Sequence, residues 1–229
     1  RPFAATSLFR DIMRFLEEWV GEHKVDEIEC LIADLSGIPR GKILPAAKFL
    51  RMAREQSLRM PESVFIQTVT GEYAEDEDEE IVGPQDHDIT LMPDDDTIRV
   101  VPWYQEPTAQ IIHDCFYADG SPVEIAARHV LRRVLQLYDD RGWRPVVAPE
   151  VEFFLVQVNT DPDLPLLPPI GRSGRPETGR QSYGIDAVNE FDPIFEDVYD
   201  YCEAQEIDID TLIHEAGAAQ MEINLLHGN

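Results

Sequence analysis

The sequence predicts an α+β protein in two parts, a small strand-dominated part followed by one in which helices alternate with extended segments. Three observations support this prediction. Short apolar runs separated by Pro, Gly and Asp turns recur between residues 25 and 118. Apolar residues at helical spacing predict an amphipathic helix over residues 7–20 and a second helix over residues 123–141. An Asp-Gly-Ser-Pro turn at residues 119–122 marks the boundary between the two parts.

The first part reads as a helix followed by short strands. A strand at Ile28–Asp34, a turn at Ser36-Gly37 and a second strand at Lys42–Leu44 predict a hairpin. A helix over residues 46–55 follows the hairpin. Six consecutive acidic residues at 75–80 predict a solvated loop, because like charges this close repel each other. Further strands are predicted at Val64–Val69, Asp88–Met92, Ile98–Trp103 and Ala109–Phe116.

The second part opens with the 123–141 helix, which ends where Gly142 can supply a C-cap. Val146–Val158 is predicted to be a strand that carries two glutamates. Residues 159–182 are rich in Pro and Gly and predict a long loop, which in a compact domain is often functional. A helix over residues 192–205 and an extended segment at Ile207–Asn224 complete the chain. We therefore expect three regions: a helical segment at 1–24, a small domain at 25–118 and the first part of a second domain at 119–229.

The charge of the chain is strongly negative, with 45 acidic residues against 19 Lys and Arg, for a net charge of −26. Such a surface repels nucleic acid and anionic membranes and attracts cations, although acidic surfaces also serve simply to keep proteins soluble. The three cysteines are far apart and form no CxxC pair, which favours a reducing compartment. No apolar run is long enough for a membrane span or a signal-peptide core. We expect a cytoplasmic protein and, because the chain starts at Arg1 and stops after a short segment ending at Asn229, a fragment of a longer polypeptide.

Two glutamates, Glu150 and Glu152, alternate with apolar residues in the strand predicted at Val146–Val158. Residues two apart in a strand project to the same face, so the two carboxylates lie side by side. Like charges held together on a packed strand are destabilising unless a cation neutralises them. The pair therefore indicates either a divalent metal site or an ordinary solvated strand face.

A second acidic pair, Glu215 and Glu222, lies among small residues in the segment Ile213–Ile223. Glycine and alanine leave room for the close approach of a ligand or of another backbone. An ordinary turn between strands, with both glutamates on the surface, would have the same composition. Together the two pairs favour a cage of carboxylates for a hard ion such as Mg²⁺ or Mn²⁺, which prefers oxygen ligands.

These segments resemble the glutamine synthetase family. Pro-Glu-Val-Glu-Phe-Phe at residues 149–154, followed by His-Glu-x-x-x-x-Gln-x-Glu-Ile at residues 214–223, is similar to the catalytic core of that family. Residues 34–42 resemble the Asp-x-x-Gly-x-x-Arg-Gly-Lys hairpin of its N-terminal domain, and residues 93–133 resemble its domain junction. The motifs occur in the family's order and cover nearly the whole chain.

The resemblance implies an N-terminal β-grasp domain at residues 25–118, followed by the first part of the α+β catalytic domain at 119–229. It also implies a homo-oligomer, a double ring with active sites shared between subunits. ATP is the co-substrate of such enzymes, and Mg²⁺ or Mn²⁺ ions hold the reactants. The γ-carboxylate of glutamate attacks the terminal phosphate of ATP, and an amine then displaces phosphate from γ-glutamyl phosphate.

Carried over by position, Glu152, Glu215 and Glu222 would hold the ion that orients glutamate and the acyl phosphate, and Glu150 would help to hold the ion at the ATP phosphates. Glu215 and Tyr183 are the candidate catalytic residues, Glu215 through the ion and Tyr183 near the amine. The family's remaining metal ligands and phosphate-binding arginines would lie beyond this chain. No residue is assigned to ATP binding, and we expect residues 1–229 alone to be inactive.

One departure concerns the amine. In true glutamine synthetases an Asp-Gly-Ser-Ser loop of the N-terminal domain helps to bind ammonium, whereas residues 69–73 here read Val-Thr-Gly-Glu-Tyr. The sequence therefore looks closer to the branch that glutamylates polyamines, the γ-glutamylpolyamine synthetases, and we expect glutamate–amine ligase activity on an organic amine. The alternatives are an ordinary glutamine synthetase that uses ammonia and a non-catalytic structural relative. The retention of four mutually repelling glutamates argues against the structural relative.

Overall fold

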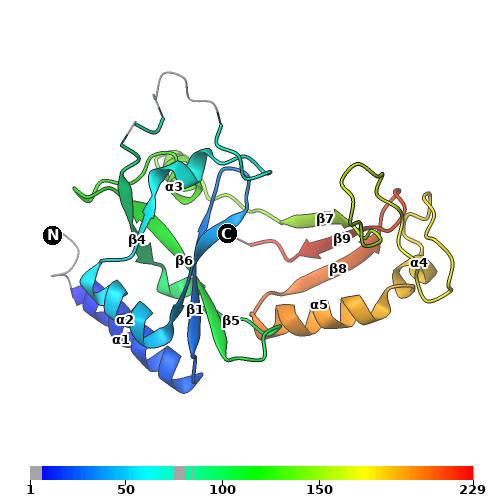
Figure 1. The fold of residues 1–229 in the computed structure, drawn as a ribbon, viewed down its shortest axis with the longest axis horizontal. Coiled ribbons are helices and arrows are strands. Elements are labelled where there is room, and N and C mark those ends of the chain that lie inside the picture. Colours follow the sequence, from blue (N-terminus) through cyan, green and yellow to red (C-terminus); the bar gives the residue numbers. More distant parts are fainter. Residues whose placement is uncertain (1–6, 75–80, 84, 229) are drawn as a thin grey trace. The chain divides into compact units, whose positions relative to one another are not determined.

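The computed structural model describes residues 7–74, 81–83 and 85–228, and it divides into two units, residues 1–143 and 144–229 (Figure 1). The first unit includes the helix predicted at 123–141. The acidic run at 75–80 lies outside the described residues. The domain boundary that we predicted between residues 118 and 119 remains a prediction.

The first unit is built on a mixed sheet of six strands. Its central order is β2-β1-β6-β4-β3, and the short β5 also pairs with β6. Neighbouring strands are antiparallel except β1 and β6, which run parallel. The strands are β1 (Glu27–Ala33), β2 (Pro39–Pro45), β3 (Arg59–Pro61), β4 (Asp88–Pro93), β5 (Arg99–Val100) and β6 (Thr108–Phe116).

Two helices, α1 (Ser7–Glu22) and α2 (Ala46–Glu55), lie side by side and cover this sheet (Figure 1). Both were predicted at nearly these bounds. The buried positions of α1 recur every three or four residues, and every second residue of β1 is buried, so each element presents one apolar face. Together they form the core of the unit, which includes Phe9, Met13, Leu16, Val20, Ile28, Cys30, Ile32 and Phe49.

The predicted hairpin between β1 and β2 is present and is organised by Asp34, which is 1% exposed. Its carboxylate accepts hydrogen bonds from the backbone N–H groups of Ser36 and Ile38, both at 2.8 Å, and from Nε of Arg40 at 2.9 Å. Burial raises the pKa of Asp34, but these donors and the charge of Arg40 lower it more, so the net pKa is below its usual value. Gly37 supplies the positive φ, +77°, that the turn requires. Arg40 also donates to the carbonyl oxygen of Thr68 at 3.3 Å and so ties the hairpin to the loop in which Gln67 and Tyr73 form a bridge.

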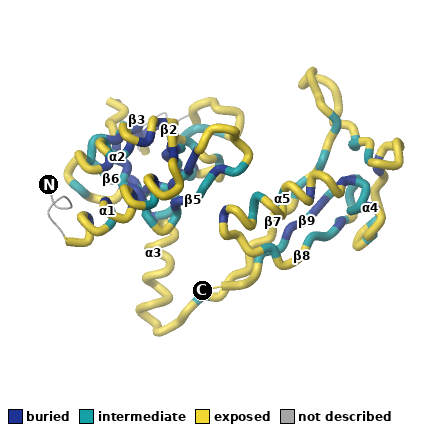
Figure 2. The backbone as a smooth tube through the Cα atoms, turned by 90° about the horizontal axis from the view of Figure 1, so that it is seen from below, coloured by how far each residue is buried: buried dark blue, intermediate teal, exposed yellow. Residues whose placement is uncertain are grey.

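The helix α3 (Ala127–Asp139) is shorter than the predicted 123–141 and leaves most of its apolar face uncovered in the part of the chain that the structure describes (Figure 2). Only His129 is buried among its residues. The exposed apolar residues are Val130, Leu131, Val134, Leu135, Leu137 and Tyr138. Ion pairs hold the start of α3 to the sheet: Arg128 contacts Asp94 and Asp114, and Arg132 contacts Asp114 at 2.7 Å.

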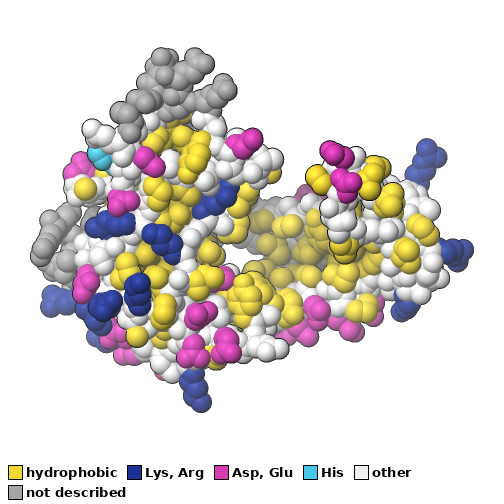
Figure 3. All heavy atoms as spheres, viewed as in Figure 1, with side chains coloured by type: hydrophobic (Ala, Val, Ile, Leu, Met, Phe, Trp, Pro, Cys, Tyr) yellow, Lys and Arg dark blue, Asp and Glu magenta, His cyan; other side chains and the backbone are white. Residues whose placement is uncertain are grey.

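The second unit has a three-stranded antiparallel sheet, in the order β7-β9-β8, with helix α5 (Asp192–Ala204) packed on one face. The strands are β7 (Glu150–Phe154), β8 (Ile209–His214) and β9 (Gln220–Leu225). Phe191 and Phe195 form a small core with Met221, and Phe153 and Leu212 pack against it. Acidic side chains line the outer side of α5 (Figure 3). None of the helices in the described residues is long and apolar enough to cross a membrane.

The structure corrects two strand predictions in the first unit. Val64–Val69 is not a strand, because its first half belongs to the 3₁₀-helix η1 (Glu62–Ile66), and a short apolar run such as Val64–Ile66 does not by itself distinguish a strand from a helix. Within Ile98–Trp103 only β5 pairs as a strand, because a second 3₁₀-helix, η2 (Asp95–Thr97), precedes it and a turn at residues 102–103 follows it.

The second unit also differs from the prediction. Val146–Val158 contains the five-residue β7 and an isolated bridge between Val147 and Gly228, so it is not one continuous strand. Ile207–Asn224 is not one extended segment but the β8–β9 hairpin. The helix α4 (Ile185–Asn189) was not predicted, whereas α5 agrees with the predicted 192–205 and residues 159–182 form the expected loop without regular strands or helices.

Candidate metal centre

The sheet of the second unit brings Glu150, Glu152 and Glu222 to one face. Glu152 of β7 lies directly opposite Glu222 of β9, and Glu150 lies opposite Asn224. Opposed residues of an antiparallel pair project to the same side, as do residues two apart on one strand. The strand register alone therefore places these three carboxylates together.

Glu215 joins the same face from the other side of β9. Ile213 of β8 lies opposite Glu222, and Glu215 follows it by two residues. The N–H of Glu215 donates to the carbonyl oxygen of Gln220 at 2.7 Å, so the ladder continues one residue beyond the end of β8. The side chain of Glu215 thus projects to the same face of the sheet as those of Glu222 and Glu152.

Glu222 is the centre of this arrangement, which we call the carboxylate face: Glu150, Glu152, Glu215 and Glu222. Directly opposed residues have Cβ atoms about 4.5–5.5 Å apart, and diagonal neighbours are about 7–8 Å apart. Glu152 is the direct neighbour of Glu222, while Glu150 and Glu215 are its diagonal neighbours. Glu215 and Glu222 are half-buried, and Glu150 and Glu152 are exposed.

The opposite face of the same sheet explains why this one is polar. Met221 and His214 are both fully buried, and Phe153 packs with Met221 against α5. Because side chains alternate across a strand, burying these residues under α5 places the glutamates on the face that α5 leaves open. Val151 is on the apolar face but is 50% exposed, so α5 covers only part of that face.

Gln220 connects the strands of the carboxylate face. Its Oε1 accepts a hydrogen bond from the N–H of Gly217 at 2.7 Å, and its Nε2 donates to Oε1 of Glu152. One amide therefore fixes both the β8–β9 turn and a carboxylate on β7. Gln220 was not among the predicted site residues, although it alternates with Glu222 and stands in the motif that carried the resemblance.

The donor set fits a hard divalent ion, since carboxylate oxygens are the ligands that Mg²⁺ and Mn²⁺ prefer. Among the described residues, no three His, Cys, Asp or Glu side chains converge closely enough to hold an ion. The glutamates share a face but do not yet point at one centre. A glutamate side chain has three rotatable bonds, so the carboxylates on an open face can turn toward one ion without a change in the backbone.

Tyr183 lies beside the end of β8. Its N–H donates to the carbonyl oxygen of His214 at 2.8 Å, its φ is +60°, and its side chain is 71% exposed. The backbone therefore brings Tyr183 next to Glu215 in space, across about 30 residues of chain that include α4 and α5. Nothing in the sequence alone indicated this edge contact.

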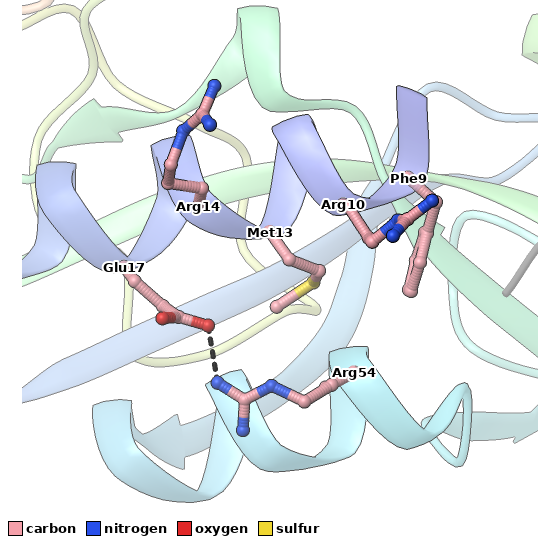
Figure 4. Close-up of a pocket in the computed structure, with 6 residues that line it drawn as sticks. All are labelled: Phe9, Arg10, Met13, Arg14, Glu17 and Arg54. Atoms are coloured by element: carbon pink, nitrogen blue, oxygen red, sulfur yellow. Dashed lines mark hydrogen bonds and ion pairs between the residues drawn. The ribbon is translucent and has the colours of Figure 1, made fainter. Parts of the chain in front are cut away.

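A different pocket, in the first unit, lies between α1 and α2 (Figure 4). Arg10 and Arg14 from α1 and Arg54 from α2 line it, together with Phe9 and Met13 from α1. Arg54 forms an ion pair with Glu17, and Arg14 forms one with Asp11 at 2.9 Å. The pocket is open to solvent and holds no carboxylate cluster, so the candidate site remains the carboxylate face.

Residues 124–229 match the family model of the glutamine synthetase catalytic domain. The resemblance carried by the sequence motifs is thereby confirmed, and the matched region contains the whole carboxylate face and Tyr183. The class of protein that this part of the chain resembles is the glutamine synthetase family of ligases.

Particular relatives narrow the comparison. The gamma-glutamylputrescine synthetase PuuA of Escherichia coli (strain K12) is 31% identical over 222 residues, which is 95% of this chain and 45% of that protein. The glutamate–isopropylamine ligase of Pseudomonas sp is 28% identical over 141 residues, covering 62% of this chain and 30% of that one. The glutamine synthetase of Pyrococcus horikoshii is 26% identical over 204 residues, which is 89% of this chain and 40% of that protein. The chain thus spans less than half the length of these relatives.

Solved structures show the same fold. The ligand-free structure of GmaS superposes with a TM-score of 0.69 at 20% identity, covering 92% of this chain and 44% of that one. A glutamine synthase homologue superposes with a TM-score of 0.68 at 18% identity, covering 89% of this chain and 44% of that one. These similarities confirm a mixed α and β fold of the glutamine synthetase type.

Proposed function

We propose that the full-length protein is an ATP-dependent glutamate–amine ligase that forms a γ-glutamyl amide from glutamate and an organic amine, a polyamine in the first instance. The observation that carries this proposal is the carboxylate face, on which the β7-β9-β8 register groups four glutamates around Glu222. A ligase that brings the carboxylate of glutamate against the phosphates of ATP needs such a group of metal ligands, whereas a structural protein gains nothing from four mutually repelling charges.

In this proposal Glu152, Glu215 and Glu222 hold a Mg²⁺ or Mn²⁺ ion near glutamate, and Glu150 helps to hold the ion at the ATP phosphates. The bound metal supplies positive charge that offsets the negative charge of the carboxylate and of the phosphates. Tyr183, beside Glu215, lies near the amine. The first unit corresponds to the family's β-grasp domain, and active sites form between subunits of a double ring.

The reaction has two displacements. A γ-carboxylate oxygen of glutamate attacks the terminal phosphorus of ATP, and ADP leaves. The amine nitrogen then attacks the acyl carbon of γ-glutamyl phosphate, inorganic phosphate leaves, and the nitrogen loses a proton. The carboxylates of this chain would hold the ion that orients glutamate.

The choice of an organic amine rests on the loop that Arg40 ties to the β1–β2 hairpin. Residues 69–73 of this loop, Val-Thr-Gly-Glu-Tyr, lack the aspartate of the Asp-Gly-Ser-Ser loop. Two of the relatives described above are named for organic amines, putrescine and isopropylamine. The second candidate, an ordinary glutamine synthetase, is favoured by the similarity to the Pyrococcus horikoshii enzyme over 89% of the chain.

Phosphate release by the full-length protein tests both candidates. We expect kcat/KM for putrescine or spermidine to exceed kcat/KM for ammonium and ethanolamine at fixed glutamate and ATP. A clear preference for ammonium would establish the second candidate. No glutamate-dependent phosphate release with any amine would exclude both.

A further inference from the structure

His214 lies at the end of β8, directly before Glu215, and its side chain is 0% exposed. Its Nδ1 atom is 2.6 Å from the carbonyl oxygen of Glu215. A carbonyl oxygen can only accept, so Nδ1 is the donor in this bond. The imidazole therefore holds the main chain of the residue whose carboxylate the proposed function requires.

Glu177 reaches the same ring from the 159–182 loop and is only 8% exposed. Its Oε1 atom accepts hydrogen bonds from the N–H of Thr178 at 3.1 Å and from Nε2 of Gln181, and it lies 3.8 Å from Nε2 of His214. That nitrogen is buried and has no hydrogen-bond partner among the described residues. The donors from Thr178 and Gln181 fix this buried carboxylate, which packs against the buried imidazole of His214.

The backbone of the 177–183 segment completes the contact. The N–H of Arg180 donates to the carbonyl oxygen of Ala216 at 2.7 Å, and the N–H of Tyr183 donates to that of His214 at 2.8 Å. Arg180 and Tyr183 have φ values of +68° and +60°, which are unfavourable for residues with side chains and persist only when the surroundings hold them. The carbonyl oxygens of residues 214, 215 and 216 thus all receive a donor from His214 or from this segment.

Glu215 needs this support because it lies outside the regular strand. The four residues that follow it are Ala, Gly, Ala and Ala, whose small side chains do little to fix a backbone. The β8–β9 ladder supplies one bond, from the N–H of Glu215 to Gln220. Without the donors on the three carbonyl groups, the direction of the Glu215 side chain relative to Glu222 would depend on a flexible turn.

We propose that Glu177 and His214 are positioning residues for Glu215: together they clamp the 177–183 segment onto the end of β8 and so fix the Glu215 carboxylate in register with Glu222. This inference rests on the proposed function, in which Glu215 is a metal ligand. Second-sphere partners of this kind change metal affinity by about 10- to 100-fold when they are removed.

The test compares Mn²⁺ binding by variants of the full-length protein, measured by EPR titration without substrates. Glu177→Ala and His214→Leu remove the two sides of the contact. Glu190→Ala is the matched control, because Glu190 also accepts a backbone N–H of this loop, from Ser173 at 2.6 Å, but has no contact with His214. His214→Asn is the conservative variant, because its amide nitrogen can replace Nδ1 as the donor to Glu215.

We expect Glu177→Ala and His214→Leu to weaken Mn²⁺ binding about 10-fold, His214→Asn to recover most of the loss, and Glu190→Ala to change it less than about threefold. Amide hydrogen exchange at residues 180, 183 and 215 should be faster in Glu177→Ala than in the control. Equal affinity of Glu177→Ala and wild type, or an equal loss in Glu190→Ala, would overturn the inference. If His214→Leu does not fold, the Glu177 and Glu190 variants decide the matter.

A Glu215→Gln variant in the same titration separates this inference from the proposed function. If Glu215→Gln loses affinity and Glu177→Ala does not, only the positioning role is wrong. If Glu215→Gln binds Mn²⁺ as tightly as wild type, Glu215 is not a ligand, and the proposed function fails together with the inference.

Discussion

Replacing Glu222 by Gln should change the stability of the full-length protein with opposite signs in the absence and presence of metal. Without metal, the substitution removes the repulsion between the directly opposed carboxylates of Glu222 and Glu152. Two unit charges about 5 Å apart in water repel by about 0.8 kcal/mol, and like charges opposed across strands are destabilising by about 0.2–1 kcal/mol. The variant should therefore be at least as stable as wild type when no ion is bound.

With metal the order should reverse. Glu222 is the only one of the four that is a direct or diagonal neighbour of all the others. We expect its loss to weaken Mn²⁺ binding about 100-fold, or about 2.8 kcal/mol. At a Mn²⁺ concentration 100 times the wild-type Kd, wild type gains about 2.7 kcal/mol of stability and the variant only about 0.4 kcal/mol.

The assay is a thermal melt of wild type, Glu222→Gln and a control, each with EDTA and with Mn²⁺, combined with an EPR titration of Mn²⁺. Glu196→Gln is the control, because Glu196 is an exposed glutamate of α5, which covers the opposite face of the sheet. If Glu222→Gln binds Mn²⁺ within about threefold of wild type, or melts lower than wild type in EDTA, the carboxylate face is not a metal site of the kind argued above.

Three further predictions concern the chain outside the carboxylate face. An isolated protein of residues 1–229 should self-associate in size-exclusion chromatography, through the uncovered apolar face of α3, and should release no phosphate from ATP; a monodisperse, active fragment would contradict this. Asp34→Asn should lower the free energy of unfolding by about 1–3 kcal/mol at pH 7, measured by urea titration of the full-length protein. The pKa of Asp34 is lowered in the folded protein, so its contribution to the free energy of unfolding should be complete above the unfolded pKa, near 3.9, and should be lost as the pH falls through the lower folded pKa. A difference between wild type and Asp34→Asn that is as large at pH 3 as at pH 7 would refute this prediction. Burial raises the pKa of the Cys30 and Cys115 thiols to about 12, so at pH 8 a thiol reagent should label Cys202 first and these two only on unfolding; labelling of all three at one rate would contradict it.

The parts of the fold that the sequence predicted well are those with a long and regular pattern. The helices α1, α2 and α5 and the β1–β2 hairpin lie close to their predicted bounds, because each repeats its apolar positions over several turns or carries a turn signal. The strand prediction at Val64–Val69 was wrong because its apolar run, Val64–Ile66, is too short to distinguish a strand from a helix. The β7 strand is shorter than predicted, because a strand extends only as far as its pairing with a neighbour is regular, and pairing beyond β7 is reduced to an isolated bridge at Val147.

The same distinction applies to the candidate site. The alternation of Glu150 and Glu152 predicted their common face from local geometry, the small residues around Glu215 and Glu222 indicated a second acidic pair, and the resemblance to a family supplied the roles of all four. The register that makes Glu222 the central carboxylate could not be predicted, since it depends on how β7, a distant part of the chain, pairs with the β8–β9 hairpin. Glu177 gave no signal either, because a glutamate in a Pro- and Gly-rich loop has no pattern that distinguishes a buried residue from an exposed one.

The chain positions of the four carboxylates also bear on how the site assembles during folding. Glu215 and Glu222 belong to one hairpin and meet as soon as its short turn closes, which is a fast and local event. Glu150 and Glu152 arrive only when β7 adds to the free edge of β9, and that step closes a loop of about 65 residues at a larger entropic cost. Because β7 is an edge strand of the described sheet, an ion bound by glutamates of both the hairpin and β7 would stabilise the pairing of β7 with β9. Metal should therefore protect the amides of β7 from hydrogen exchange more than those of β8.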